Sequence, residues 1–432
     1  MDPAITGLFG IGFLVILIFA GVPVGVTLSL VGFGGFIAIL GLDKALANMA
    51  LIPFATVNRY SFAVIPLFLL MSAFVGRSGI GEDAYRTARA WVGHIKGGLA
   101  MATVVACGLF AATSGSSLAT AVAMGKVAYP EMRKLRYDAT LAIGCIAAGG
   151  SLGLLIPPSM AFILIGILTE VSIGKLFMAG IIPGVLEILF YALAIYIMCR
   201  RNPEMGPAIA KVPFRQKVTS IKDTWMVAVL FFGVIGGIYG GVFTPTEAGG
   251  AGAFGALIIG LVTRRLNRED LKFCFMDTAR HAAMIIVMLI GAFVFMRFLA
   301  YTRIPNLASE WVVTLNLPPM IILIVILVSF LFFGMFFDMY AVVILTTPIL
   351  FPIMMDMGFD PIWWGVIMCR MIEIGMITPP FGINLFGLAA SAEVPVGIMY
   401  RGIIPFVIAD IFVVAVLVAF PILSTYIPYQ LM

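Results

Sequence analysis

The sequence predicts an all-α polytopic membrane protein with about ten transmembrane spans and two re-entrant helical hairpins in an inverted-topology repeat. Three observations lead to this fold class: the composition, the placement of the basic residues and an internal repeat. Of the 432 residues, 62% are apolar and only 11% are charged, and the mean hydropathy is +1.13. A soluble domain is about half apolar and about a quarter charged. The composition therefore excludes a water-soluble globule.

Ten apolar segments approach the length of about 20 residues that a helix needs to cross a bilayer. In chain order we place these spans at 7–20, 24–40, 60–76, 139–168, 176–199, 225–243, 247–263, 280–300, 362–390 and 402–426. We expect the first span to be retained, because the opening Met-Asp-Pro-Ala has no basic residue and no small-residue cleavage site follows the apolar run.

Two further apolar stretches, 98–130 and 320–355, are each long enough for two short arms and have no charged loop at their middle. We expect them to be re-entrant hairpins whose two ends return to one side of the membrane. The polar cluster 113–117, Thr-Ser-Gly-Ser-Ser, is expected at the tip of the first hairpin. Alternatively, these hydroxyls bond back to their own helix. Gly334 and Asp338 lie in the matching zone of the second hairpin.

The basic residues predict the orientation of the spans, because Lys and Arg collect in loops that stay in the cytoplasm. If segment 200–223 is cytoplasmic, counting one span at a time places four more basic segments on the same side. Together the five segments hold 19 of the 26 basic residues: 77–97, 131–138, 200–223, 264–280 and 391–401. The hairpin at 98–130 must then open to the cytoplasm, since both its flanks are basic. The hairpin at 320–355 has acidic flanks and should open to the opposite side.

The sequence repeats itself at a shift of 222 residues, which carries Pro157 onto Pro379 without a gap. Each copy contains a hairpin, a span interrupted by Gly-x-x-x-Pro-Pro and one further span, and the charges orient the copies oppositely. Such inverted repeats with broken helices are typical of secondary transporters. Because neither proline has an N–H, carbonyls one turn earlier lose their partners and can bind a cation. The alternative is a simple proline kink, which membrane helices tolerate.

Several motifs together resemble the large membrane subunit of tripartite ATP-independent periplasmic (TRAP) transporters over essentially the whole chain. They are Gly21-Val-Pro-Val-Gly25, Ser114-Gly-Ser-Ser117, Gly149-Gly-Ser-Leu-Gly-Leu-Leu-Ile-Pro-Pro-Ser159, Phe243-Thr-Pro-Thr-Glu-Ala248 and Gly375-Met-Ile-Thr-Pro-Pro-Phe-Gly382. The resemblance implies an elevator-type, sodium-coupled importer of small organic anions in a bacterial inner membrane. It also implies two protein partners, a small four-helix membrane subunit and a periplasmic substrate-binding protein. Membrane lipids are the further expected partner, and no binding of nucleic acid is expected.

The same resemblance implies two sodium sites, with sodium as the coupling ion and no cofactor. The first would use the first hairpin tip and the first break: Ser114, Ser116, Ser117, Gly153, Ile156 and Pro158. The second would use Gly334, Gly375, Thr378 and Pro380. The repeat, found independently, relates the break residues of the two sites to each other. No Walker-type phosphate loop is present in the sequence, which agrees with transport that does not use ATP.

We name Arg370, Asp338, Ser159 and Asn384 as candidate substrate ligands. Arg370 departs from the family pattern, and its guanidinium offers a planar fork to a carboxylate or sulfonate. Alternatively, Arg370 pairs with Glu373 one helical turn away. For Asp338, a purely structural pairing is an equal alternative to a functional role. Glu247 is expected to cap a helix. Lys126, Lys175 and Arg297 are expected to extend to lipid headgroups.

By repeat position, we expect the hairpins and broken spans to move against a scaffold. The predicted division is scaffold at 1–97, 171–319 and 393–432, and transport domain at 98–170 and 320–392. Two other classes stay open, a passive anion channel and an embedded enzyme. An enzyme would need a nucleophile with its base, a metal cluster or paired carboxylates at membrane depth, and the sequence shows no such set. The five single cysteines indicate neither disulfides nor a zinc site.

Overall fold

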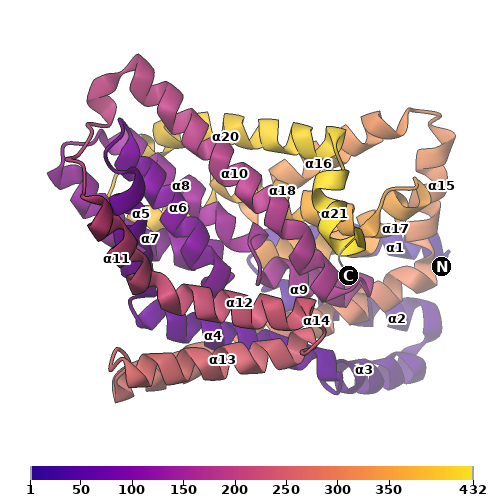
Figure 1. Cartoon of the computed structure of the whole chain (residues 1–432). Helices are drawn as coiled ribbons and strands as arrows, with labels where there is room; N and C mark the ends of the chain where they lie inside the picture. The colour runs from indigo at the N-terminus through magenta and orange to yellow at the C-terminus, as the bar shows by residue number, and fades with distance from the viewer. Residues whose placement is uncertain (1, 431–432) are drawn as a thin grey trace.

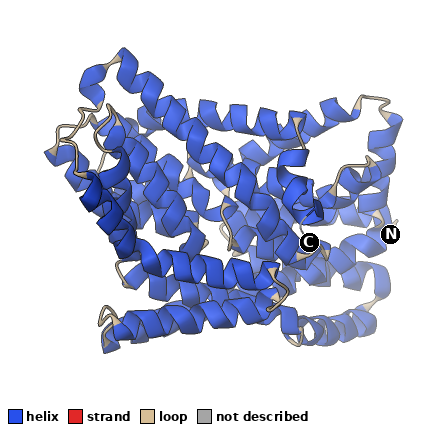
Figure 2. Ribbon diagram, viewed as in Figure 1, coloured by secondary structure: helices blue, strands red, loops and turns tan. Residues whose placement is uncertain are grey.

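The computed structural model describes residues 2–430, which form helices joined by short connections and contain no strand (Figure 2). The α-helices, drawn in Figure 1, are α1 (Pro3–Phe19), α2 (Val24–Leu40), α3 (Leu42–Val57), α4 (Val64–Arg77), α5 (Ile80–Val92), α6 (Gly98–Ser114), α7 (Ser117–Lys134), α8 (Ala139–Leu155), α9 (Met160–Thr169), α10 (Ile173–Arg201), α11 (Phe214–Ile221), α12 (Trp225–Tyr239), α13 (Pro245–Val262), α14 (Arg268–Thr302), α15 (Ile304–Thr314), α16 (Pro319–Phe336), α17 (Met339–Asp356), α18 (Pro361–Ile377), α19 (Ile383–Ala392), α20 (Val396–Ala419) and α21 (Ile422–Gln430). The all-α fold class predicted from composition is confirmed.

Eight helices within the described residues are long and apolar enough to cross a membrane, and a ninth span results if α11 and α12 are taken together. Every predicted span coincides with a helix or, for 139–168 and 362–390, with two helices separated by the predicted break. The last span ends earlier than predicted, at Ala419 instead of residue 426. Its end is set by Pro421, because the residue before a proline is disfavoured in the α conformation, and Phe420 is extended at φ −129° and ψ 74°.

The internal repeat is present in three dimensions. We call α6–α10 the first copy and α16–α20 the second copy. Helices α7 and α8 correspond residue for residue to α17 and α18 at the shift of 222, and each copy is broken before a cis Pro-Pro bond. The carboxylates of Asp138 and Asp360 begin α8 and α18 in the same way, each accepting two backbone N–H groups. This N-cap satisfies donors that a helix start leaves free, so both broken spans begin at fixed positions.

Contacts between loops agree with the sidedness predicted from charge. Gly97 N donates to Gly206 O (2.8 Å), Asp138 N donates to Met205 O (2.9 Å), and Arg265 pairs with Asp83. These contacts join four of the five basic segments at one end of the molecule, which we call the basic end. At the opposite end, Tyr429 donates to Asp360 (2.7 Å) and Ser309 donates to Asp356. The two hairpins therefore open toward opposite ends, with α5 and α15 at those ends (Figure 1).

Four helices, α3, α5, α11 and α15, were not predicted from the sequence. Helix α5 has a strongly one-sided apolar pattern and buries Ile80, Ala84 and Ala88 while Glu82 and Arg86 face outward; Asp83 is buried and pairs with Arg265. Such amphipathic helices lie along an interface instead of crossing it. A search for uniformly apolar runs finds membrane spans and misses helices with one apolar face.

Candidate functional site

The tip of the first hairpin lies directly on the break between α8 and α9. A Cβ added to Gly153 would lie 2.6 Å from the carbonyl carbon and oxygen of Ser116, so only glycine permits this approach. Met160 N donates to Gly115 O at 3.5 Å, and Gly115 turns the tip at φ +62°. The structure thus brings the predicted first-site residues of the tip and of the break together.

The tip is rich in hydroxyl groups that already form a local network. Ser114 Oγ lies 2.9 Å from Thr120 Oγ1, which donates to Ser116 O at 2.8 Å. Ser116 Oγ caps the start of α7, and Ser159 Oγ, fully buried, caps the start of α9. The bonding of hydroxyls to nearby backbone, which was the alternative for this cluster, is therefore present. These neutral oxygens are also of the type that hard monovalent cations prefer.

The second hairpin also lies close to its break, but the contact is made by Gly334 in the last turn of α16, whose counterpart in the first copy is Ala112, and not by the tip. A Cβ on Gly375 would lie 2.6 Å from the Cα of Gly334, and one on Gly334 would lie 2.9 Å from Gly375 Cα. Thr378 N donates to Gly375 O at 3.1 Å, and Tyr400 donates its hydroxyl to Pro380 O. Gly334 and Gly375 form this contact and Thr378 is bonded to Gly375, whereas Pro380 is contacted by Tyr400 of α20.

A direct hydrogen bond links the two copies near their tips. Asn384 Nδ2, at the start of α19, donates to Ser117 Oγ at 3.0 Å. Asn384 is fully buried, and its Oδ1 has no hydrogen-bond partner among the described residues. An orphaned buried carbonyl is costly unless a further donor or a cation satisfies it. This oxygen therefore points to a ligand position between the copies.

A cavity of about 580 Å³, lined by both apolar and polar side chains, lies beside the first tip. It extends from Ser114 and Ser116 to Arg77 and His281 at the basic end, and Tyr340, just after the second tip, also lines it. Lys126, on α7, is exposed in this cavity, and no ion-pair partner is found for it among the described residues. That Lys126 extends to lipid headgroups stays a prediction. Its ammonium group can instead face the cavity, which it lines.

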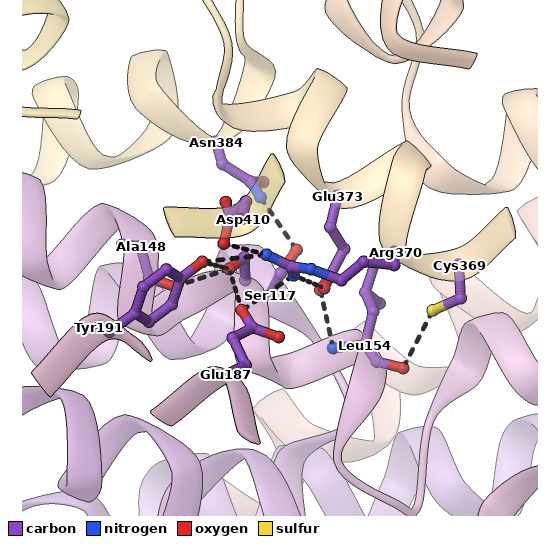
Figure 3. A network of polar contacts seen from close by, with 11 residues as sticks. Ser117, Ala148, Leu154, Glu187, Tyr191, Cys369, Arg370, Glu373, Asn384 and Asp410 are labelled. Atoms are coloured by element: carbon purple, nitrogen blue, oxygen red, sulfur yellow. Dashed lines mark hydrogen bonds and ion pairs between the residues drawn. The ribbon is translucent and has the colours of Figure 1, made fainter. Parts of the chain in front are cut away.

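Arg370 lies at the centre of a buried charge network (Figure 3). Its Nη1 is 2.8 Å from Glu187 Oε1 of α10 and 2.8 Å from Glu373 Oε2 of α18, and its Nη2 pairs with Asp410 of α20. Nη2 also donates to the Tyr191 hydroxyl at 3.1 Å. All four charged side chains are 0% exposed. The pairing with Glu373, the alternative to a substrate role, is therefore present, and substrate contact by Arg370 stays a prediction.

Sequence reasoning missed Glu187 and Asp410. The rule that an ionisable residue within a span deserves a functional hypothesis would have identified both, since Glu187 lies inside 176–199 and Asp410 inside 402–426. Their convergence on Arg370 could not be read from the sequence, because it depends on how α10, α18 and α20 pack.

The remaining candidates have simple local roles. Asp338 is exposed and caps α17, accepting from Ala341 N at 2.9 Å. Glu247 forms a capping box with Thr244 at the start of α13, as predicted. No group of three or more His, Cys, Asp or Glu side chains within residues 2–430 has the geometry of a metal site. A cation at either tip would therefore be held by carbonyl and hydroxyl oxygens.

Comparison with known proteins gives consistent matches. Residues 11–423 match the family model described as "Tripartite ATP-independent periplasmic transporter, DctM component". The C4-dicarboxylate TRAP transporter large permease protein DctM of Pseudomonas aeruginosa is 36% identical over 92% of this chain and 91% of its own. The isethionate TRAP transporter permease protein DctMQ of Oleidesulfovibrio alaskensis is 32% identical over 96% of this chain and 64% of its own.

Among solved structures, the YdaH transporter of Alcanivorax borkumensis is similar in fold, with a TM-score of 0.63 and 17% identity. The match covers 90% of this chain and 89% of that one. At this identity the likeness concerns the fold alone.

Proposed function

Because the chain belongs to the DctM component family of tripartite ATP-independent periplasmic transporters, we propose that it carries out sodium-coupled import of a small organic anion by an elevator mechanism. It is a multi-pass membrane protein of the bacterial inner membrane. Its relatives are named transporter permease subunits, so an embedded enzyme is set aside.

One observation carries the proposal: in each copy the hairpin lies against the glycine of a Gly-x-x-x-Pro-Pro break through a backbone contact that leaves no room for a Cβ. At a break the backbone carbonyls are not all used within a helix, and unwound carbonyls coordinate Na⁺ in transporters of this architecture. One such contact in each copy supports two sodium sites. Hydroxyls of Ser114 and Ser117 add to the first, and Thr378 adds to the second.

The cavity supports an anion as the substrate. Arg77 and Lys126 line it and Asp277 is its one carboxylate; Arg77 is paired with Asp270 at 3.4 Å, so Lys126 supplies the positive charge that has no ion-pair partner among the described residues. A surplus of positive charge in a cleft with low-dielectric walls attracts anions. Relatives named for C4-dicarboxylate and isethionate carry anions, and carboxylates or sulfonates are the substrate class we propose. The cavity reaches the basic end, which supports a conformation open to the cytoplasm.

The moving unit extends, we infer, to α10 and α20. A Cβ on Gly402 of α20 would lie 2.2 Å from Thr140 O of α8, and Glu187 and Asp410 are ion-paired with Arg370 of α18. Sliding α18 past α10 and α20 would leave buried charges unpaired, which costs about 3–5 kcal/mol for one broken pair. These four helices therefore move together, and α10 and α20 join the predicted transport segments.

Energetics favour this coupling. If two sodium ions enter with one monovalent anion, one net positive charge moves inward and gains about 2.3 kcal/mol per 100 mV of inside-negative potential. We propose that the anion is delivered by a periplasmic binding protein and that a small membrane subunit completes the complex. The fused name DctMQ of one relative supports a close association between two membrane subunits.

The test is uptake into proteoliposomes that contain the chain, the small subunit and the binding protein. Labelled C4-dicarboxylate and isethionate are supplied with an inward gradient of sodium or of potassium. We expect accumulation above the external concentration with the sodium gradient only. Uptake that merely equilibrates the anion and ignores sodium would favour the alternative, a passive anion channel.

A further inference from the structure

The network around Arg370 has an excess of acidic groups. One guanidinium faces three carboxyl groups, and every one of these side chains is fully buried. Fully ionised, the network would hold two surplus negative charges within the membrane-spanning part of the chain. An uncompensated buried ion costs several kcal/mol, and a buried carboxyl group usually becomes neutral by taking up a proton instead.

The hydrogen bonds distinguish the three carboxyl groups. Glu373 receives a donor at each oxygen, from Leu154 N at 3.1 Å and from Arg370 Nη1 at 2.8 Å. That arrangement suits a carboxylate, which is acceptor-only. By contrast, Glu187 Oε2 and Asp410 Oδ2 have no hydrogen-bond partner among the described residues. Glu187 and Asp410 are therefore the two carboxyl groups at which a proton replaces a missing charge.

A neighbouring hydroxyl can accept the proton of Glu187. Ser151 Oγ donates to Ala148 O at 2.6 Å and lies 3.2 Å from Glu187 Oε1. Its lone pairs are then free to accept from a protonated Glu187. The repeat places Ser151 at the position that Glu373 occupies in the second copy, so a neutral group and a charged one face Glu187 from equivalent sites.

The groups that face Glu187 and Asp410 come from two further helices, α8 and α18, and from α10, the helix of Glu187 itself. They are Ser151 of α8, Tyr191 of α10, and Cys369, Arg370 and Glu373 of α18. Arg370 is the one cation in this set. A metal ion in place of the protons is disfavoured, because no metal-binding group was found within residues 2–430.

We propose that Glu187 and Asp410 are a proton-binding pair, both protonated at neutral pH, while Glu373 is the ionised partner of Arg370. Neutrality lets α10 and α20 pack against α8 and α18 without a surplus buried charge. Raising the pH removes these protons and leaves the charges unpaired, so the packing of the four helices weakens. This inference does not depend on sodium coupling, and its failure would leave the proposed function standing.

Infrared spectroscopy of the purified full-length chain in lipid nanodiscs tests the protonation directly. At neutral pH we expect absorption from protonated carboxyl groups that shifts in D₂O. Glu187→Gln and Asp410→Asn should each remove part of it, whereas Glu82→Gln, at an exposed carboxylate on α5, should leave it unchanged. Absence of the absorption in the unmodified chain, or its full retention in both network variants, would overturn the proposal.

Thermal unfolding measured across a range of pH provides a second readout, which does not require either single variant to fold stably. The double variant Glu187→Gln/Asp410→Asn carries the charge of the protonated pair and should unfold within a few degrees of the unmodified chain at neutral pH. Above neutral pH the unmodified chain and Glu82→Gln should lose stability, and the double variant should not share this loss. Equal pH dependence in all three proteins, or a double variant that is much less stable at neutral pH, would contradict the proton-binding pair.

Discussion

The two copies of the repeat share a backbone and differ in chemistry. Both pack a hairpin against a glycine at a Pro-Pro break, through the tip in the first copy and through Gly334 of α16 in the second, and both begin the broken span at an aspartate. The tips differ: Ser114 and Ser116 of the first copy correspond to Phe336 and Asp338 of the second. On the broken helix the second copy has the charged residue instead, because Ala148 of the first copy corresponds to Arg370 of the second.

The spaces beside the two hairpins follow the same division. The cavity at the first tip contains Arg77 and Lys126, whereas a cavity of about 440 Å³ between α1 and the second hairpin is lined almost entirely by apolar residues such as Phe332, Phe336 and Ile349. The inverted repeat thus supplies two backbone frames for ions. Polar access is provided by the first copy, and three of the four internal charges, Arg370, Glu373 and Asp410, are provided by the second, with Glu187 coming from the first.

The largest effect is expected at Arg370, which has no charged counterpart in the first copy. Arg370→Gln leaves Glu373 uncompensated and should lower the free energy of unfolding by about 3–5 kcal/mol. Thermal unfolding of the purified chain measures this loss. The double variant Arg370→Gln/Glu373→Gln should regain most of the stability. Arg297→Gln, at an exposed arginine of α14, should change stability by at most about 0.5 kcal/mol, and an equal loss at both arginines would refute a specific network.

The next effect should appear equally in both copies. Gly153→Ala and Gly375→Ala each place a Cβ 2.6 Å from backbone atoms of a hairpin, Ser116 in the first copy and Gly334 in the second, and such overpacking costs about 1–3 kcal/mol. We expect both variants to lose sodium-dependent uptake in proteoliposomes.

The matched control for these glycines is Gly236→Ala on α12, where an added Cβ meets nothing within 4 Å. It should transport normally. If only one of the two break variants lost uptake, the functional equivalence of the two tips would be wrong.

A smaller effect should distinguish the copies at their tips. Ser117→Ala removes the hydroxyl that accepts from Asn384 and is a proposed sodium ligand. Loss of one hydrogen-bonding ligand is worth about 1.4 kcal/mol, which is about tenfold in the half-saturating sodium concentration for uptake. The counterpart variant Met339→Leu should leave that concentration unchanged. A similar shift in both variants would indicate general loosening of the tips.

The smallest effect is expected at Lys126, whose counterpart in the second copy is Pro348. Lys126→Gln removes one exposed positive charge from the cavity, and exposed charge interactions are worth about 0.2–1 kcal/mol. The half-saturating anion concentration should rise by up to about fivefold, less at high salt because salt screens the attraction. Kinetics that do not change at low salt would remove Lys126 from the anion path.

Much of this arrangement could be predicted from the sequence, because it is encoded locally. Apolar runs gave the spans, and the pairs of prolines at 157–158 and 379–380 gave the breaks. The repeat then placed Gly153 and Gly375 at equivalent sites. Sidedness followed from basic loops, whose charges now prove to be joined by contacts such as Arg265 with Asp83.

What could not be predicted depends on packing between distant segments. Glu187, Arg370 and Asp410 are far apart in the sequence and meet only because α10, α18 and α20 cross near one point. The bond from Asn384 to Ser117 likewise joins residues of opposite copies. Lipid-facing and protein-facing apolar surfaces are chemically alike, so the sequence could not show that α10 and α20 pack on the broken spans.

The central claim is that each copy of the repeat holds one sodium ion, and direct counting of bound sodium tests it. Binding of radioactive sodium to the purified chain, with and without its small membrane subunit, should saturate at two ions per chain. Ser117→Ala and Thr378→Ala should each lower the affinity for one sodium ion and leave the affinity for the other unchanged. Saturation below two ions in the unmodified chain, or simultaneous loss of both ions in each variant, would contradict the account.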